Sequence, residues 1–220
     1  MGKYQLALFD LDGTIADTSK GVVNCVKYAE KKLNLPRLDE SVYRKFIGPP
    51  NAVAYHNYYG LTGERLDMAV KYHALYALKK GVYEVQEYAG IHRILDYLKN
   101  KGYRIAVATL KKQEAAEKVL RYLGLYGYFD MIAGDEGKGE GKKDLLLKCL
   151  IRTNIARERA VLIGDSEYDQ GGAADSGIDF IGVLYGFGFG KKADLQYFPY
   201  SAVAADTDEL YKILKERTEQ

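Results

Sequence analysis

Phe9-Asp10-Leu11-Asp12-Gly13-Thr14 carries the strongest structural signal in this chain of 220 residues. The apolar residues that lead into it, Leu6-Ala7-Leu8, are few enough to form a buried parallel strand rather than a helix. Two carboxylates then stand two residues apart, and the glycine after them lets the chain turn sharply. In an open α/β sheet, ligands bind just outside the carboxyl ends of the strands. We therefore expect Asp10 and Asp12 to bind a metal or attack an electrophile, although an aspartate in such a turn often only caps a helix.

From about residue 87 onward, short apolar runs alternate with segments of helical periodicity. This alternation predicts βαβ units, and therefore a parallel sheet with helices on both of its faces. Right-handed crossovers leave few topologies for such a sheet. The expected fold class is α/β, a doubly wound parallel sheet. After the strand at 6–9, the predicted strands are 104–109, 131–133, 160–164 and 180–184, and the predicted helices are one ending at 102, 112–123, 143–153, a short one ending at 177, and about 206–217.

Residues 16–83 contain helix-like segments and no strand-like run. A block of this length is too long for an ordinary connection between a strand and a helix. We therefore expect two domains, a catalytic α/β core made of residues 1–15 and 84–220 and an inserted all-helical domain at 16–83. Hinges are expected near 14–18 and 82–88. The predicted helices of the inserted domain lie near 20–34, 39–47, 51–59 and 62–80.

Polar residues stand at the carboxyl end of each of the first four predicted strands. Because parallel strands end at the same edge of a sheet, we expect these residues to form one site. Each alone would be ordinary loop chemistry, but together they indicate a site. They are Asp10 and Asp12 after the first strand, Thr109 after the second, the glycine-rich basic loop 134–143 after the third, and Asp165 and Asp169 after the fourth.

Four carboxylates at this edge need a cation. Negative charges placed so close raise one another's pKa and cost stability unless something neutralises them. Carboxylate oxygens without a cluster of histidine or cysteine favour Mg²⁺, which binds through carboxylates, water and substrate phosphate. Acid, metal, lysine and hydroxyl together are typical of phosphoryl transfer.

On these motifs the chain resembles a haloacid dehalogenase (HAD) superfamily hydrolase, of the phosphatase type with a helical cap inserted after the first strand. The matching motifs are Asp10-Leu11-Asp12-Gly13-Thr14, Thr109, a lysine in the third loop, and residues 164–169 with their two aspartates. They span nearly the whole chain and follow the order that the superfamily has.

Two further segments resemble the phosphoglycolate phosphatase-like group of this superfamily. They are Phe46-Ile47-Gly48-Pro49-Pro50 in the inserted block and Gly186-Phe187-Gly188 near the end of the chain. The resemblance also implies a flavodoxin-like core in which the strand that bears Asp165 lies beside the strand that bears Asp10.

The resemblance implies a role for each matched residue. Asp10 would be the nucleophile that forms an aspartyl-phosphate, and Asp12 would protonate the leaving oxygen and then deprotonate water. Thr109 would bind phosphate oxygens. The Mg²⁺ ion would be held by Asp10, the backbone carbonyl of Asp12, and Asp165. Asp169 would be a further metal ligand, or it would position the ligands without binding the ion itself.

The lysine of the third loop departs from the commonest family pattern, which is Lys-Pro. Lys142 is preferred because it precedes Asp144 and an apolar helix face by two residues, as in relatives without the proline. Lys138 and Lys143 stay open as alternatives, and at least two of these three lysines must be ordinary loop charges.

The expected function is that of a Mg²⁺-dependent phosphatase acting on a small phosphorylated metabolite. Phosphoglycolate is the first candidate, followed by nucleoside monophosphates and pyrophosphate. A phosphomutase of the β-phosphoglucomutase type stays open, while a carbon–halogen dehalogenase and a non-catalytic phosphate sensor fit the motifs less well. Specificity should come from the inserted helices. Its candidate residues, which the sequence does not place against a substrate, are Arg44, Lys45, Asn51 and Tyr55.

Composition and charge exclude other classes of partner. The chain is 47% hydrophobic and 28% charged, with a net charge of +2, as in an ordinary globular protein. No basic stripe points to nucleic acid, and no apolar run is long enough to span a membrane. We expect a cytoplasmic enzyme that is a monomer or a homodimer. Cys25 and Cys149 lie in helix-like stretches and are expected to be buried rather than joined in a disulfide.

Overall fold

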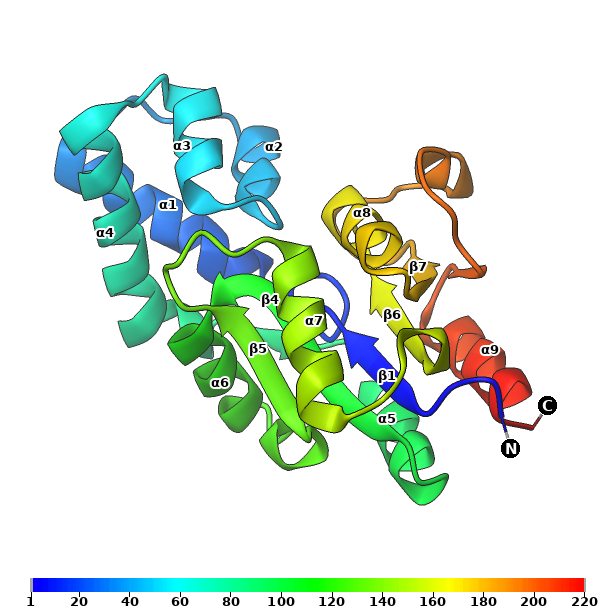
Figure 1. The fold of residues 1–220 in the computed structure, drawn as a ribbon. Helices are drawn as coiled ribbons and strands as arrows, with labels where there is room; N and C mark the ends of the chain where they lie inside the picture. Colours follow the sequence, from blue (N-terminus) through cyan, green and yellow to red (C-terminus); the bar gives the residue numbers. More distant parts are fainter. Residues whose placement is uncertain (1, 220) are drawn as a thin grey trace.

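Within residues 2–219, which the computed structural model describes, six parallel strands form the central sheet in the order β5-β4-β1-β6-β7-β8 (Figure 1). Helices pack on both faces of this sheet. The predicted α/β class with a doubly wound parallel sheet is therefore confirmed. The strands are β1 (Leu6–Phe9), β4 (Arg104–Lys112), β5 (Met131–Asp135), β6 (Ala160–Gly164), β7 (Asp179–Val183) and β8 (Ala202–Ala204).

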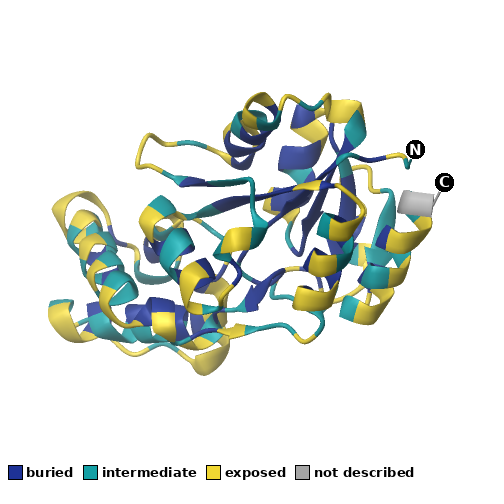
Figure 2. Cartoon of the chain, turned by 90° about the horizontal axis from the view of Figure 1, so that it is seen from below, coloured by how far each residue is buried: buried dark blue, intermediate teal, exposed yellow. Residues whose placement is uncertain are grey.

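Strand β1 lies between β4 and β6 and is buried on both faces. Its last residue, Phe9, pairs with Val107 of β4 and with Ile163 of β6. Its side chains alternate between two hydrophobic cores, with Leu8 in one and Phe9 in the other. A strand covered on both faces needs a continuous apolar run, which explains why Leu6–Phe9 contains no polar residue. Figure 2 shows the sheet strands largely buried, beneath helices whose outer faces are exposed.

The helices of the α/β core form two layers, one on each face of the sheet. Helices α5, α6 and α9 contribute to one hydrophobic core, and α7 and α8 contribute to the other. Helices α5, α6, α7 and α9 each present an apolar face to the sheet, as amphipathic helices do, whereas α8 contributes only Ala173 to the core. The helices are α5 (Ile91–Asn100), α6 (Gln113–Tyr122), α7 (Lys142–Thr153), α8 (Glu167–Ser176) and α9 (Thr207–Glu219).

Four helices, α1 to α4, form a helical insertion between β1 and β4. Figure 1 shows them at the end of the sheet toward which the strand arrows point. They share a hydrophobic core of their own, which includes Val26, Phe46, Tyr55 and Ala69. The helices are α1 (Ser19–Leu33), α2 (Glu40–Tyr43), α3 (Asn51–Tyr59) and α4 (Gly63–Lys79).

A two-stranded ribbon joins the chain segments that enter and leave the helical insertion. Strand β2 (Ala16–Asp17) pairs antiparallel with β3 (Gln86–Glu87). Both strands fall within the predicted hinge segments, but two residues are too short to give a periodic signal in the sequence. The ribbon keeps the two crossings side by side. The limits of the inserted domain, 16–83, stay a prediction.

Three elements differ from the prediction. The helix expected at 39–47 ends at Tyr43 and continues as a 3₁₀ turn over Arg44–Phe46. Strand β4 runs past Thr109 to Lys112, and its register with β5 shifts between Ala108 and Lys112. The short strand β8 was not predicted.

Other expectations concern the cysteines and the membrane. Cys25 and Cys149 are buried and not disulfide-bonded, as expected. In the part of the chain that the structure describes, no helix combines the length and the apolar character needed to cross a membrane.

Candidate active site

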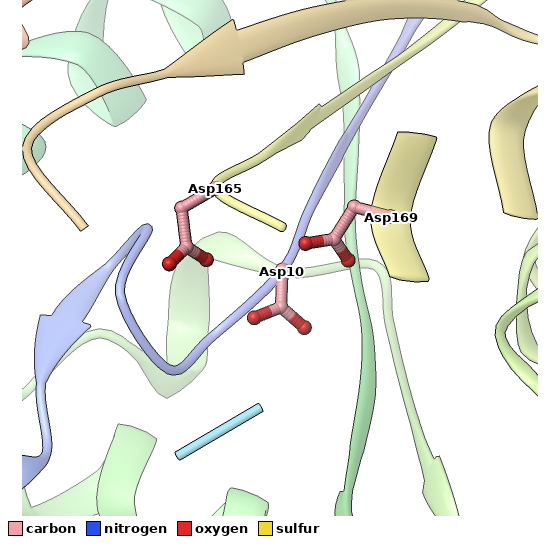
Figure 3. Close-up of side chains that lie close together, drawn as sticks. All are labelled: Asp10, Asp165 and Asp169. Atoms are coloured by element: carbon pink, nitrogen blue, oxygen red, sulfur yellow. The ribbon is translucent and has the colours of Figure 1, made fainter. Parts of the chain in front are cut away.

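Three buried carboxylates converge beyond the carboxyl ends of β1 and β6 (Figure 3). Asp10 directly follows β1, Asp165 directly follows β6, and Asp169 lies in the first turn of α8. Oxygen atoms of the three side chains lie within 4.8 Å of one another. We call this group the carboxylate cluster. The adjacency of β1 and β6 brings Asp10 and Asp165 together, because each residue leaves its strand at the same edge.

Lys142 lies buried against the carboxylate cluster. Its Nζ is 2.6 Å from Oδ1 of Asp10 and 2.6 Å from Oδ1 of Asp169. The same ammonium donates a hydrogen bond of 2.8 Å to the carbonyl of Ala108. Hydrogen bonds to Asp10 and to Ala108, together with the ion pair with Asp169, therefore fix the position of this ammonium. Lys142 is the first residue of α7, and the Asp144 carboxylate caps that helix by accepting from the N–H of Gly141.

The other two lysines of the loop lie elsewhere. Lys138 pairs at 2.6 Å with Glu136, and both side chains are exposed. Lys143 is exposed at the surface of α7. Of the three lysines that the sequence left open, Lys142 is the one that the structure brings to the carboxylates.

The carboxylate cluster holds more negative charge than Lys142 neutralises. Burial, together with the neighbouring aspartates and against the opposing effect of Lys142, raises the pKa of Asp10 to about 8. Burial and the charge of Asp169 raise the pKa of Asp165 to about 7. Burial by itself would lower the pKa of Lys142, but the charges of Asp10 and Asp169 outweigh it and raise that pKa.

Asp165 sits in a tight cradle of backbone. Its Oδ2 accepts hydrogen bonds from the N–H groups of Phe187, at 2.7 Å, and Gly188, at 3.1 Å. A Cβ atom at Gly13 would lie 2.3 Å from this oxygen, and one at Gly186 would lie 2.4 Å from it. Both positions therefore require glycine, and Gly13 also has a positive φ of 88°.

The side chain of Asp12 lies outside the carboxylate cluster. Lys111 donates to both of its oxygens, at 2.9 Å and 3.1 Å, and the hydroxyl of Thr18 donates to Oδ1. Burial alone would lower the pKa of Lys111, but the charge of Asp12 raises it. Of the four aspartates predicted to bind metal, Asp12 could therefore contribute only its backbone carbonyl in this conformation.

Thr109 is buried next to Asp10 and Lys142. These three residues line a small cavity of about 20 Å³, together with Gly48 of the helical insertion. The hydroxyl of Thr109 accepts from the backbone N–H of Lys111 at 3.2 Å. Although Thr109 lies within β4 rather than at its end, it stands where the register with β5 shifts, so its position still faces the site.

Two larger cavities lie between the helical insertion and the edge of the sheet. We call the one of about 570 Å³, which is also lined by Asp165, the upper cavity, and the one of about 750 Å³ the lower cavity. Asp12 and Gly48 line both of them. Both cavities therefore reach the residues around the carboxylate cluster.

The four candidate specificity residues lie in different parts of the structure. Arg44 and Lys45 line the upper cavity, and Asn51 lines the lower cavity. Tyr55 is buried in the core of the helical insertion, where its hydroxyl lies 3.2 Å from Nδ1 of His73. Tyr55 therefore supports the insertion and does not face a substrate.

Sequence reasoning missed Lys111 and Thr18, the partners of the Asp12 side chain. A signal for Lys111 was present, because residues two apart in a strand point to the same side and Lys111 follows Thr109 by two. Thr18 lay within a predicted hinge, and nothing in its local sequence indicated a contact with Asp12.

With this geometry in place, comparison with known proteins gives the family. Residues 7–183 match the sequence profile described as haloacid dehalogenase-like hydrolase. The chain belongs to this family. A 5'-nucleotidase of Pseudomonas aeruginosa is 31% identical over 215 residues, which are 97% of this chain and 96% of that enzyme. The tyrosine-protein kinase PtkA of Mycobacterium tuberculosis is 32% identical over 212 residues, which are 96% of this chain and 72% of that protein.

The solved structures agree with this assignment. The crystal structure of a predicted phosphatase from Clostridium acetobutylicum has a TM-score of 0.90 and 35% identity, covering 97% of this chain and 99% of that chain. Among the sequence relatives, a phosphoglycolate phosphatase of Aquifex aeolicus is 29% identical over 185 residues, or 83% of this chain and 86% of that enzyme. The predicted resemblance to this HAD group is confirmed, and the protein is a hydrolase, a phosphatase of the HAD type.

The carboxylate cluster fits a hard divalent cation. Asp10, Asp165 and Asp169 offer only carboxylate oxygens, the ligands that Mg²⁺ prefers. The raised pKa values of Asp10 and Asp165 show that a further positive charge would favour the ionised form of both.

Proposed function

We propose that the protein is a Mg²⁺-dependent phosphatase that hydrolyses a small phosphomonoester through an aspartyl-phosphate on Asp10. The observation that supports this most strongly is the meeting of the carboxylate cluster with the Lys142 ammonium in one buried site. A fixed ammonium beside a carboxylate lets that carboxylate approach a phosphoryl group without prohibitive charge repulsion. Membership of the HAD phosphatases agrees with the proposal.

In the first step, an oxygen of Asp10 attacks phosphorus and the bond from phosphorus to the ester oxygen breaks. Asp12 donates its proton to the departing oxygen, so the leaving group departs as an alcohol. In the second step, a water molecule attacks the phosphorus of the aspartyl-phosphate while Asp12 accepts a proton from it. Phosphate leaves, and Asp10 is again a free carboxylate.

Lys142 prepares Asp10 for this attack. Its ammonium lies 2.6 Å from Oδ1 of Asp10 and opposes the rise in pKa that burial causes. Because Lys142 is also held by Asp169 and the carbonyl of Ala108, it keeps its place while charge moves between Asp10 and the phosphoryl group. Thr109, on the wall of the same small cavity, would donate its hydroxyl to a phosphate oxygen.

Mg²⁺ would be held by Asp10, the backbone carbonyl of Asp12, and Asp165, with Asp169 either as a ligand or as an anchor for Lys142. Bound there, it would neutralise phosphate charge and polarise the phosphoryl group. The protein's part is to hold Asp165 rigidly, which the N–H groups of Phe187 and Gly188 do.

Asp12 must carry a proton in the first step, so the groups that contact its carboxylate affect this role. In the structure Lys111 and Thr18 hold its carboxylate. Asp12 lines all three cavities at the site, so it borders the space that the leaving group would occupy. Thr18 lies beside β2, so a movement of the helical insertion would change this contact.

The substrate should be small, because the helical insertion covers the site. Phosphoglycolate, nucleoside monophosphates and pyrophosphate are the candidates, in keeping with the names of the relatives. We also propose residues 16–83 as the extent of the inserted domain, since β2 and β3 mark the crossings between it and the core.

A turnover screen tests the proposal. Purified protein should release phosphate from p-nitrophenyl phosphate in the presence of Mg²⁺ and lose this activity with EDTA. The variant Asp10→Asn should be inactive while remaining folded by circular dichroism. Full activity of Asp10→Asn would reject the nucleophile, and transfer of the phosphoryl group back to substrate rather than to water would indicate a phosphomutase instead.

A further inference from the structure

We propose that the leaving group of the substrate occupies the upper cavity and carries a second negative charge, which Arg44 and Lys45 bind. This inference rests on the proposed function, because it requires the phosphoryl group to be bound beside Asp10. It names the substrate class: phosphomonoesters whose alcohol portion bears a carboxylate or another anionic group.

The upper cavity is continuous with the phosphoryl site. Asp12 and Asp165 form part of its wall, and Gly48 lines both this cavity and the small cavity that contains Asp10 and Thr109. A phosphate placed against Asp10 therefore projects its ester oxygen past Asp12, toward the larger volume. The space of about 570 Å³ is ample for a leaving group of a few carbon atoms.

The local fold of the helical insertion turns Arg44 and Lys45 outward. They belong to the 3₁₀ turn Arg44–Phe46, and both Phe46 and the residue that precedes the turn, Tyr43, are buried in the core of the insertion. Residues three apart in a 3₁₀ helix share a face, so the two between them lie on the other side. Within residues 2–219, neither the guanidinium of Arg44 nor the ammonium of Lys45 has an ion pair or hydrogen bond.

Most of the acids that line the upper cavity already have partners. Asp194 accepts from the N–H groups of Gly190 and Lys191. Asp12 is paired with Lys111, and Asp165 accepts two backbone N–H groups and belongs to the carboxylate cluster.

Glu167, at the start of α8, is the exception, and it is exposed. Two unpaired cations therefore oppose one unpaired carboxylate in this cavity. Because these two cations stand on the side of the helical insertion, they favour an anion there, where the guanidinium of Arg44 can bind a carboxylate through two parallel hydrogen bonds.

The lower cavity offers no such charge. Its two lysines are both paired, Lys111 with Asp12 and Lys112 with Asp135 at 2.5 Å. Its wall on the side of the helical insertion is mostly apolar and includes Val70, Ala74, Ala77 and Leu78. An anionic leaving group would lose its hydration there without gaining a partner.

Two pairs of esters test this inference, since the members of each pair differ only in a carboxylate or a hydroxymethyl group. The pairs are phosphoglycolate with 2-hydroxyethyl phosphate, and 3-phosphoglycerate with glycerol 3-phosphate. The wild type should favour the carboxylate in at least one pair by about tenfold in kcat/KM. In Arg44→Ala and in Lys45→Ala, kcat/KM for the carboxylate ester should fall much further than kcat/KM for its neutral partner, so that most of this preference is lost.

Arg37→Ala is the matched control, because Arg37 is an exposed arginine of the same insertion that lines neither cavity. It should keep the wild-type preference. The charge reversal Arg44→Glu should raise the relative kcat/KM for O-phosphoethanolamine, whose leaving group is cationic, which a merely structural role of Arg44 would not do.

Three outcomes would overturn the inference. They are equal turnover of the paired esters, an equal loss of carboxylate and neutral esters in Arg44→Ala, or a nucleoside monophosphate as best substrate with Arg44→Ala unaffected. If p-nitrophenyl phosphate is hydrolysed with Mg²⁺ in these cases, the proposed function stands and only this inference fails. Failure to turn over any phosphate ester would overturn both.

Discussion

Nζ of Lys142 lies 2.6 Å from Oδ1 of Asp10, and both side chains are at least nine-tenths buried. Burying two opposite charges is tolerated only where their remaining hydrogen-bonding groups are satisfied as well. For Lys142, the carbonyl of Ala108 accepts a second hydrogen bond, and Asp169 places a second negative charge 2.6 Å from Nζ. The ammonium therefore opposes the rise in the pKa of Asp10 that burial and the neighbouring acids cause.

Replacing Lys142 should slow catalysis strongly. The variant Lys142→Met leaves Asp10 and Asp169 without their shared cation, so we expect kcat to fall by about 10²- to 10³-fold, as for loss of a fixed transition-state donor. Steady-state kinetics with p-nitrophenyl phosphate measure this. Lys143→Met, one residue further along the exposed surface, is the control and should behave as wild type. More than a tenth of normal kcat in Lys142→Met would contradict the role given to Lys142.

Stability without metal should fall as the pH rises. Burial raises the pKa of Asp10 to about 8 and that of Asp165 to about 7, whereas in the unfolded chain both groups titrate near 3.8. Between the unfolded pKa of 3.8 and the folded pKa of about 8, the folded state therefore binds more protons than the unfolded state. Folding stability is greatest at the acidic end of this range and is lost as the pH rises toward about 8. Thermal unfolding in EDTA should show a melting temperature lower by several degrees at about pH 8.5 than at about pH 6.5.

Two comparisons make this pH prediction specific. Burial also lowers the pKa of His73 to about 3, which destabilises the protein only below about pH 6.5, so the range above it isolates the acids. Mg²⁺ should reduce the fall, because it favours the ionised carboxylates. Asp10→Asn should have a shallower fall in EDTA than wild type, and an identical slope for the two proteins would count against the raised pKa of Asp10.

A methyl group at Gly13 should weaken metal binding. The Cβ of Gly13→Ala would lie 2.3 Å from Oδ2 of Asp165 and would displace that carboxylate. Gly102→Ala is the matched control, because Gly102 also has a positive φ, 77°, but no atom within 4 Å of the added Cβ. Both variants should lose about 1–3 kcal/mol of stability from backbone strain. Only Gly13→Ala should need a higher Mg²⁺ concentration for half-maximal activity; the same requirement in both would refute the cradle.

The acid role of Asp12 depends on the leaving group. An alkoxide needs a proton to depart, whereas p-nitrophenolate is a good leaving group without one. Asp12→Asn should therefore lower kcat/KM for glycerol 3-phosphate by about 10²- to 10⁴-fold and that for p-nitrophenyl phosphate by much less. Comparison of the two substrates in the same preparation provides the internal control. Equal losses for both substrates would mean that Asp12 does not protonate the leaving oxygen in the first step.

The parts of the fold and of the site that follow from where the strands end could be predicted from the sequence. Each apolar run such as Leu6–Phe9 identified a strand, and a parallel sheet then determines that Asp10 and Asp165 leave at the same edge. The choice of Lys142 among three lysines followed from family resemblance rather than physics, because a glycine-rich loop has no periodicity to say which side chain turns inward.

Other features depend on contacts between distant segments. The β2–β3 ribbon has two residues in each strand and exists because the two crossings of the helical insertion meet. Lys111 reaches Asp12 across the edge between β1 and β4, and its spacing from Thr109 could indicate only the side on which it lies, not this partner. The register shift that lets β4 continue past Thr109 arises from its pairing with β5. Such features require the assembled sheet and cannot be read from one segment.

Chemical trapping of the intermediate tests the central claim most directly. Borohydride reduces an acyl phosphate of aspartate to homoserine, and peptide mass spectrometry then locates the modified residue. With Mg²⁺ and substrate present, we expect homoserine at position 10, none in the absence of substrate, and none in Asp10→Asn. Steady turnover with Asp10 unmodified, or with homoserine at another aspartate, would contradict an aspartyl-phosphate on Asp10.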